Sequence, residues 1–390
     1  MTVMKNENKS LITRYYLATA LLHADFILPV CLIYPVKQLG FSFTQATSFF
    51  VILWISTLLT DFFSGSVADR FSRKKAFICG AILYGAAVSL PFIFLHWYPA
   101  FILFAIVAGI GYSLGNGSID GIVANKLKDD DPVLYRRANS YVMLWLFVSR
   151  ATCSVLGGLL YVVSPKAPFI AFCLTAVLSG IVALGIEDNS IQKVEQITSI
   201  MKEAISVFKK HVVTLLLPVI GLAVSVIGAD ILFGYYQPFF SRNGLTEIQI
   251  GYLFAAASIF SAGGAWMGSR IKNSRTTINI ILLFTAIEGL VFAFSGWKLA
   301  LFSIFLIGIV GGLSEPVTRL IINEHSEHRF RTSALSVGSS IGLVGTLIGY
   351  QLSGIFADKG SARSVGLVAV GVQVVALGCF MPYLLHLRKS

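Results

Sequence analysis

The sequence predicts an all-α membrane protein with twelve transmembrane helices, and three observations lead to this prediction. Of the 390 residues, 56% are hydrophobic and 13% are charged, whereas a soluble domain carries about 25% charged residues. The mean hydropathy is +0.78. The apolar residues are grouped into runs of roughly 20 residues, the length that crosses a bilayer as a helix. Most of the chain is therefore expected to face lipid or other apolar helices.

The apolar runs fall into two sets of six, separated by the polar stretch 187–211. Part of this stretch, 197–208, has the apolar spacing of a short amphipathic helix on the membrane surface. We expect an N-terminal six-helix bundle (1–186), a cytoplasmic linker (187–211) and a C-terminal six-helix bundle (212–390). The expected spans are 15–36, 44–66, 76–95, 98–125, 138–163, 167–186, 212–239, 246–268, 277–296, 299–323, 332–355 and 364–386.

The positive charges predict the orientation of the chain. With both termini in the cytoplasm, 22 of the 30 Lys and Arg residues fall in inner segments and six fall in outer loops. Cytoplasmic loops of membrane proteins carry such an excess of Lys and Arg. The net charge of +11 is therefore interpreted as a topology signal, and nucleic acid is excluded as a partner. We expect a multi-pass protein of the cell (inner) membrane with both ends inside.

The two halves of the chain repeat each other. The sequences LGFSFTQ (39–45) and NGLTEIQ (243–249) share Gly, an apolar residue, Ser or Thr, and Gln in register. The first helix of each half carries an Ala-Asp pair, ending at Asp25 and Asp230. Three further pairs share an offset of 195 residues: Asp120 with Glu315, Asp129 with Glu324, and Arg136 with Arg331. Duplicated halves are a common construction of transporters, which bind substrate near the bilayer midplane between the repeats.

The connection between the second and third expected helices carries the most specific motif. Residues 65–75 read GSVADRFSRKK. Gly65 lets two helices approach closely, and Asp69 lies among cations at the inner membrane face, where it can pair with them or with a helix N-terminus. The segment resembles the Gly-x-Leu-Ala-Asp-Arg-x-Gly-Arg-Lys-Lys signature of the major facilitator superfamily. It lacks only the second glycine of that signature, which is Ser72 here.

This resemblance covers the whole chain and implies both a fold and a mechanism. The fold is two pseudo-symmetric six-helix bundles, and the activity is secondary active transport by alternating access. In the family, charges at the inner face form salt bridges that favour the outward-open state and break when that state closes. The residues that match this cytoplasmic gate are Gly65, Asp69, Arg70, Arg73, Asp129, Arg136, Glu324 and Arg331.

Ionisable residues inside the membrane are candidates for function, because they cost several kcal/mol unless they are paired or wetted. Asp25 lies about halfway along its expected helix, where a carboxyl group suits the loading and release of protons. Arg150 is the expected partner of Asp120, and Glu315 and Arg319 are expected to neutralise each other at i, i+4 spacing. The candidates for proton coupling or the substrate cavity are Asp25, Asp120, Arg150, Asp230, Glu288, Glu315, Arg319, Tyr235, Tyr236 and Gln237.

Several of these interpretations have a purely structural alternative. Asp25 can be a carboxyl bonded to a neighbouring helix, and Glu288 can face the cavity or bond across to a neighbour. Tyr235 and Tyr236 can line the cavity or belong to the aromatic belt at the membrane interface.

The likeness to proton-coupled drug exporters of the superfamily is incomplete. These exporters carry an Arg four residues before a Gly-x-Gly in the fourth helix, and here Ala105 takes that place before Gly109-Ile110-Gly111. They also carry Gly-Pro-x-x-Gly-Gly in the fifth helix, of which residues 153–158 keep only the final glycine pair. The chain is closest in appearance to drug-exporter-like members, but its antiporter motifs are degenerate.

We therefore expect a secondary active transporter for proton-coupled efflux of small amphipathic compounds. The alternative is a proton-coupled importer of a polar or anionic nutrient such as a sugar, organic acid or siderophore. An enzyme is not expected, because the sequence has no nucleophile motif, no His-based metal spacing and no nucleotide-binding loop. No cofactor or metal is expected, and the expected partners are a small-molecule substrate, protons and the lipid bilayer, with the protein acting as a monomer.

Overall fold

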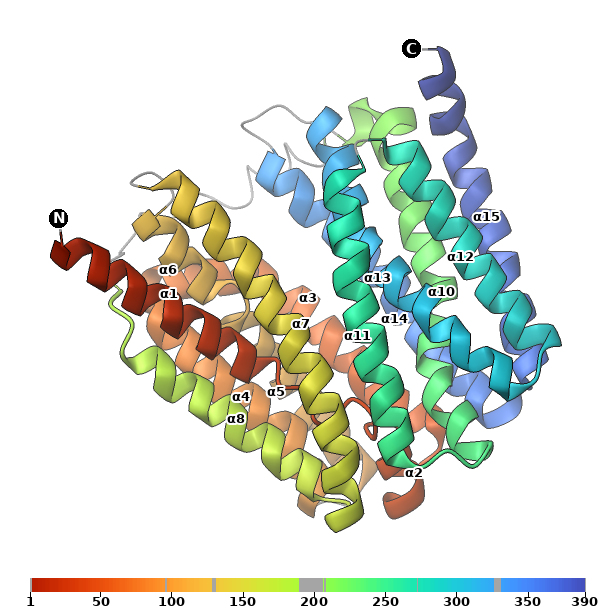
Figure 1. The fold of residues 1–390 in the computed structure, drawn as a ribbon, viewed down its shortest axis with the longest axis horizontal. Helices are drawn as coiled ribbons and strands as arrows, with labels where there is room; N and C mark the ends of the chain where they lie inside the picture. The colour runs from red at the N-terminus through yellow and green to blue at the C-terminus, as the bar shows by residue number, and fades with distance from the viewer. Residues whose placement is uncertain are drawn as a thin grey trace. The chain divides into compact units, whose positions relative to one another are not determined.

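The computed structural model describes residues 2–94, 97–127, 131–188, 206, 208–271, 273–325 and 331–389. Every regular element of these residues is a helix (Figure 1). Eleven helical segments among them are long and apolar enough to cross a membrane. The all-helical membrane fold expected from the sequence is therefore confirmed. The amphipathic helix expected at 197–208 falls largely outside the described residues.

The chain divides into two compact units that do not follow the two halves of the sequence. The first unit comprises Met1–Tyr34, Ile52–Glu195 and Glu247–Ala255. The second comprises Pro35–Val51, Gln196–Thr246 and Ala256–Ser390. The unit boundaries cut across three helices, α2 (Ile33–Leu39), α3 (Phe43–Phe71) and α11 (Glu247–Arg270). Each unit therefore contains a short segment of the other sequence half. The domain boundaries predicted at 186 and 212 stay a prediction.

The first unit is built around α4 and its neighbours. A close approach between α4 and α5 is possible because glycines meet there: a Cβ on Gly80 would lie 2.7 Å from the carbonyl oxygen of Gly111. α4 and α8 also run side by side (Figure 1). Small residues at such contacts let helix backbones pack closely in a membrane. The complete helices of this unit are α1 (Thr2–Leu22), α4 (Arg73–Phe94), α5 (Tyr98–Gly115), α6 (Ser118–Leu127), α7 (Pro132–Val163) and α8 (Ala167–Leu184).

The second unit is built around α10, which packs against α12, α13, α14 and α15. α12 and α15 lie side by side (Figure 1), and a Cβ on Gly289 would lie 2.8 Å from the carbonyl oxygen of Gly366. The complete helices of this unit are the π-helical turn η1 (Val212–Leu216), α10 (Leu217–Arg242), α12 (Ser274–Phe294), α13 (Trp297–His325), α14 (Arg331–Lys359) and α15 (Ala362–Lys389).

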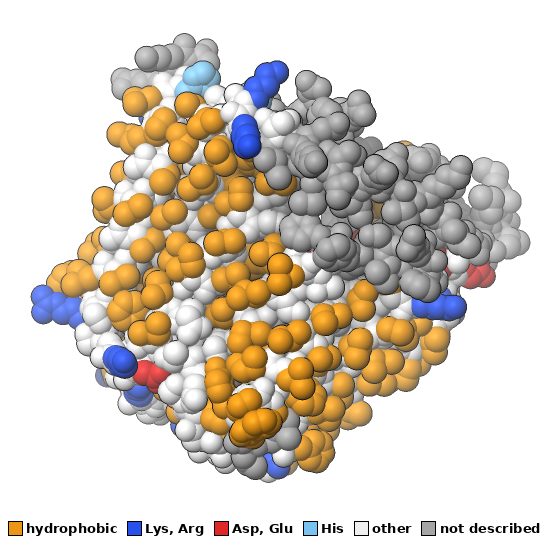
Figure 2. Space-filling model, turned by 180° about the vertical axis from the view of Figure 1, so that it is seen from behind, with side chains coloured by type: hydrophobic (Ala, Val, Ile, Leu, Met, Phe, Trp, Pro, Cys, Tyr) orange, Lys and Arg blue, Asp and Glu red, His pale blue; other side chains and the backbone are white. Residues whose placement is uncertain are grey.

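The outer surface explains the hydrophobic composition. Large apolar side chains such as Leu174 and Ile181 on α8 and Val374 and Val375 on α15 are about half exposed. Figure 2 shows hydrophobic side chains over most of the described surface on one face, with few charged groups among them. Lipid tails supply the apolar surroundings that these side chains lack within the protein.

The first expected span, 15–36, is not one continuous helix, and this corrects the sequence prediction. α1 ends at Leu22, α2 begins at Ile33, and the residues between them form turns. Pro29 has no amide hydrogen to donate and disfavours helical geometry at the residue before it. The amides of Phe26 and Leu28 instead donate to oxygens two and three residues back, on Ala24 (2.7 Å) and Asp25 (3.2 Å).

Candidate functional site

The break between α1 and α2 holds the principal ion pair of the first unit. Nε of Arg150, on α7, lies 2.9 Å from Oδ2 of Asp25. The side chain of Asp25 is 20% exposed and that of Arg150 is 37% exposed, so the pair is partly shielded. α7 reaches the break because Gly157, two turns after Arg150, leaves no side chain to block the carbonyl oxygen of Phe26.

Aromatic rings surround this pair within the same unit. The hydroxyls of Tyr84 and Tyr112 lie near enough to Asp25 and Arg150 to interact with both charges. The two tyrosine rings meet edge to face with centroids 5.2 Å apart. The ring of Tyr112 also meets those of Trp54 (5.1 Å) and His23 (6.3 Å) edge to face. A charged group and flat apolar surfaces therefore occur together, a combination that suits an amphipathic solute.

Asp230 occupies the corresponding place in the second unit, with different surroundings. It lies within α10, and its carboxyl group accepts a hydrogen bond from Thr346 on α14. Its Oδ2 atom is buried and has no hydrogen-bond partner among the residues that the structure describes. A Cβ on Gly349 would lie 2.8 Å from the Cβ of Asp230, so α14 passes directly against this residue.

A second carboxyl group of the second unit is fully enclosed. Glu288 on α12 is 0% exposed, and its Oε1 atom is hydrogen bonded to the hydroxyl of Tyr236 on α10 at 2.7 Å. That hydroxyl also lies 2.7 Å from Oγ of Ser303 on α13. Glu288 thus bonds across to neighbouring helices. The neighbouring candidates Tyr235 and Gln237 are also buried, so neither tyrosine lies in an exposed aromatic belt.

The partner predicted for Asp120 was wrong. The hydroxyl of Tyr15, on α1, donates to Oδ1 of Asp120, on α6, at 2.5 Å. Arg150 is bonded to Asp25 instead. The prediction assumed that sequential helices supply the partner, but α1 packs against both α6 and α7 and supplies Tyr15 to Asp120.

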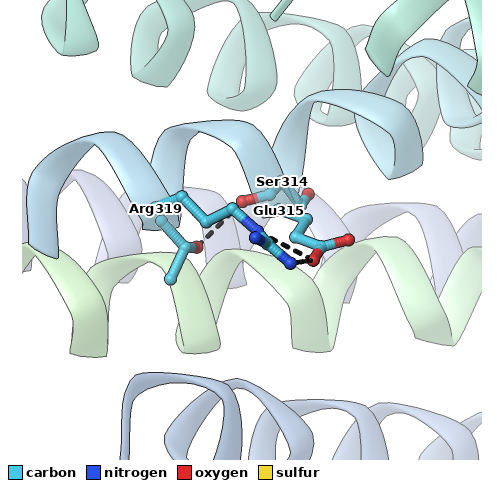
Figure 3. A network of polar contacts seen from close by, with 4 residues as sticks. Ser314, Glu315 and Arg319 are labelled. Atoms are coloured by element: carbon cyan, nitrogen blue, oxygen red, sulfur yellow. Dashed lines mark hydrogen bonds and ion pairs between the residues drawn. The ribbon is translucent and has the colours of Figure 1, made fainter. Parts of the chain in front are cut away.

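The predicted pair on α13 is present. Nη2 of Arg319 lies 2.5 Å from Oε1 of Glu315, and Nε of Arg319 lies 3.0 Å from the same atom (Figure 3). Both side chains are about 60% exposed, at 61% and 62%. The two charges neutralise each other on one helix face, as expected from the i, i+4 spacing.

Most of the predicted gate lies outside what the structure describes. Residue 129 is not described, nor are the side chains of Gly65, Asp69, Arg70, Arg136, Glu324 and Arg331. Arg73 is described, and its guanidinium group packs directly against Gly121 of α6. The gating role of this set stays a prediction.

Ser72 explains the departure from the family motif. Its φ of +116° lies in the left-handed region that glycine enters freely, which accounts for the glycine of the signature. The Ser72 hydroxyl donates to Oδ2 of Asp188 at 2.8 Å, and the same carboxylate accepts from the amide of Lys74 at 3.0 Å. Asp188 therefore caps the start of α4, a role that the sequence analysis missed because it treated this residue as part of the linker.

Two other carboxylates were also missed. Oδ1 of Asp61, on α3, accepts a hydrogen bond of 2.5 Å from Ser113 on α5. Asp358, at the end of α14, accepts from the amides of Phe43 and Thr44, each at 2.8 Å, and so caps the start of α3. A signal existed for Asp61, because it is an acidic residue inside an apolar run. Asp358 lies at a helix end, where an acidic residue attracts no notice.

The chain matches known proteins along almost its full length. The family model described as Major Facilitator Superfamily matches residues 15–294 and 264–389. An uncharacterized MFS-type transporter of Bacillus subtilis (strain 168), YxaM, is 21% identical over 372 residues, which span 92% of this chain and 90% of that protein.

Solved structures show the same fold. The crystal structure of the nucleoside transporter NupG is similar with a TM-score of 0.74 at 16% identity, covering 97% of this chain and 99% of that one. The D-xylose-proton symporter is similar with a TM-score of 0.72 at 13% identity, covering 95% and 97%. At this identity the likeness establishes the fold alone.

Proposed function

The chain belongs to the major facilitator superfamily and is therefore a multi-pass secondary transporter of a small solute, for which we propose proton-coupled efflux of amphipathic compounds. The observation that carries the proposal is the Asp25–Arg150 pair, at 2.9 Å, beside the tyrosine, tryptophan and histidine rings of the first unit.

The pair supports coupling because protonation of Asp25 would break its ion pair with Arg150. A proton on Asp25 removes the negative charge that holds the Arg150 guanidinium group. The reverse step, loss of the proton, restores the ion pair. A solute that interacts with either charge competes with this exchange, which is the basis of coupling between solute and proton.

The aromatic rings support an amphipathic solute. The faces of Trp54 and Tyr112 offer apolar contact to a flat organic group, and an organic cation is attracted to such faces. The carboxylate of Asp25 supplies the opposite charge for that cation. Asp230 supports the proposal from the second unit, because its buried Oδ2 atom has no hydrogen-bond partner in the described part of the chain, which suits a carboxyl group that carries a proton.

The alternative, proton-coupled import of a polar or anionic nutrient, has one observation in its favour. The side chain of Arg150 is 37% exposed, and a guanidinium group binds carboxylates and phosphates with two parallel hydrogen bonds. Two of the similar solved structures are those of a nucleoside transporter and a D-xylose-proton symporter, whose solutes are polar.

Proteoliposomes that contain a pH-sensitive dye separate the two functions. Ethidium is added outside as the amphipathic cation, and uridine or xylose as the polar solute. Exchange of entering ethidium for a proton makes the lumen alkaline, which we expect. Acidification on addition of uridine or xylose, with no response to ethidium, would favour the importer.

The Asp25→Asn variant tests the carboxyl group itself. An amide cannot bind and release the proton, so we expect the ethidium-driven alkalinisation to be lost while the protein still folds. The matched control is Asp61→Asn, which alters another carboxyl group of the first unit that bonds to Ser113. Unchanged proton movement in Asp25→Asn would contradict the role given to Asp25.

A further inference from the structure

The contacts of Glu288 require a hydrogen that the neighbouring hydroxyls cannot supply. Three successive contacts between oxygen atoms lead from α12 to α13. They are Glu288 Oε1 with the Tyr236 hydroxyl (2.7 Å), the Tyr236 hydroxyl with Ser303 Oγ (2.7 Å), and Ser303 Oγ with the carbonyl oxygen of Ala300 (2.6 Å). Each distance is that of a hydrogen bond between oxygens.

Each of these three contacts needs a hydrogen atom between the two oxygens. Tyr236 and Ser303 carry one hydroxyl hydrogen each, and a backbone carbonyl carries none. If Glu288 is ionised, any placement of the two hydrogens leaves one pair of oxygens in close contact with nothing between them. If Glu288 is protonated, the chain closes: Glu288 donates to Tyr236, Tyr236 to Ser303, and Ser303 to the Ala300 carbonyl.

The surroundings of the carboxyl group agree with a neutral form. Glu288, Tyr236 and Ser303 are 0%, 1% and 2% exposed. The other carboxyl oxygen, Oε2, is buried and has no hydrogen-bond partner among the described residues. An ionised carboxylate would leave this oxygen charged and bare, whereas the carbonyl oxygen of a neutral acid tolerates the position far better.

Aromatic rings close the site to water. The ring of Tyr236 stacks on Phe240 with centroids 5.5 Å apart and meets Phe292 edge to face at 5.4 Å. Two charged groups of the packed helices have other contacts: Asp230 lies against α14, and Arg363 of α15 lies over the ring of Phe294. Among the described groups, Tyr236 is the titratable group that interacts with Glu288.

We propose that Glu288 is a second proton-binding site. Its proton, donated to the Tyr236 hydroxyl, completes the hydrogen-bond chain that joins α10, α12 and α13, and it is exchanged during transport. Its role in transport rests on the proposed proton-coupled function. The site differs from the Asp25 site because no cation among the described residues holds the carboxyl group. Release of the proton leaves a buried charge and an incomplete hydrogen-bond chain, so release requires these three helices to separate and admit water.

Infrared spectroscopy of the purified, reconstituted protein at neutral pH tests for the bound proton. The wild type is expected to show the C=O stretch of a protonated carboxyl group that is absent from Glu288→Gln. In Tyr236→Phe the band should persist but shift to higher frequency, because the carboxyl hydrogen has lost its acceptor. The control is Glu315→Gln, which removes an exposed, Arg319-paired carboxylate and should change only the carboxylate stretch. Loss of a carboxylate band in Glu288→Gln would overturn the proposal.

The ethidium assay then tests whether the proton is exchanged. Glu288→Gln mimics the protonated form permanently, so ethidium-driven proton movement should be lost while the protein keeps its thermal stability. If Glu288→Gln moved protons as the wild type does, the proposal that Glu288 exchanges its proton during transport would be wrong. If the wild type itself moved no protons, the proposed function would fail and the transport role of Glu288 with it, whereas the infrared band would still show whether the proton is bound.

Discussion

Asp25 and Asp230 both follow an alanine in the first part of their sequence half, yet the chain around them folds differently. Asp25 lies in the turns between α1 and α2, and its carboxylate meets a guanidinium group. Asp230 lies within α10, which runs unbroken from Leu217 to Arg242, and it is hydrogen bonded to a hydroxyl group. The two positions are duplicates in sequence but not in environment.

The partners of the two aspartates occupy equivalent positions. Arg150 and Thr346 each lie eight residues before a glycine, Gly158 on α7 and Gly354 on α14. A Cβ on Gly158 would lie 2.6 Å from the carbonyl oxygen of Glu247 at the start of α11. The same atom on Gly354 would lie 2.8 Å from the carbonyl oxygen of Phe43, at the start of α3. The backbone contact is therefore repeated in both units.

The repeated backbone with different side chains shows where the halves diverged. A carboxylate beside an arginine stays charged, because the cation compensates for its loss of water. A carboxyl group that receives a single hydroxyl bond in an apolar helix has no such compensation. The helix crossings are thus repeated, and we expect the different partners to give the two aspartates different electrostatic states.

The largest loss of stability is expected from breaking the Asp25–Arg150 ion pair. Arg150→Met leaves the Asp25 carboxylate without its cation, and removal of one member of a shielded pair costs about 3 kcal/mol. Thermal unfolding in detergent should report this loss as a lower midpoint. The double variant Asp25→Asn with Arg150→Met should recover part of it, because neither charge then remains.

The double-mutant cycle also checks that the two residues act together. A coupling of about 1–3 kcal/mol is expected for residues in direct contact. Additive effects of the two single variants would show that the pair does not stabilise the fold.

A smaller loss of stability is expected from substitutions at the helix contact that both units share. Gly158→Ala and Gly354→Ala each place a methyl group against helix backbone, and such overpacking costs about 1–3 kcal/mol. Gly342→Ala, on the same helix as Gly354, is the matched control, since nothing lies within 4 Å of its added Cβ. Similar losses in the two test variants, with none in the control, would establish that the crossings are equivalent. A loss in only one of them would break the equivalence.

The sequence predicted the features of this comparison that depend on composition and repetition. Apolar runs predicted the membrane helices, and the repeated Ala-Asp pair identified both aspartates. The break at residues 23–32 was not predicted, because hydropathy averages over a span and does not detect where backbone hydrogen bonds change partners. Pro29 was the available signal.

The contacts of the candidate site were harder to predict because they depend on the packing of helices that are distant in sequence. Arg150 was assigned to Asp120, but it pairs with Asp25, which lies 125 positions away in the chain. The Glu288–Tyr236–Ser303 chain joins three helices whose rotation about their own axes is fixed only in the folded structure. No spacing rule within a single helix finds such a set.

The smallest effect is expected from neutralising the second aspartate. Asp230→Asn replaces a carboxyl group that has no cation beside it by an amide of the same shape, which can still accept the hydrogen bond of Thr346. The stability change should be about 1 kcal/mol or less, near the centre of the distribution for point substitutions. Thermal unfolding of Asp230→Asn and Asp25→Asn in the same detergent makes the comparison direct. Asp25→Asn should lower the midpoint more, because it leaves Arg150 unpaired. An equal or larger loss in Asp230→Asn would mean that Asp230 is charged in the folded protein, and that the two duplicated carboxyl groups share one electrostatic state after all.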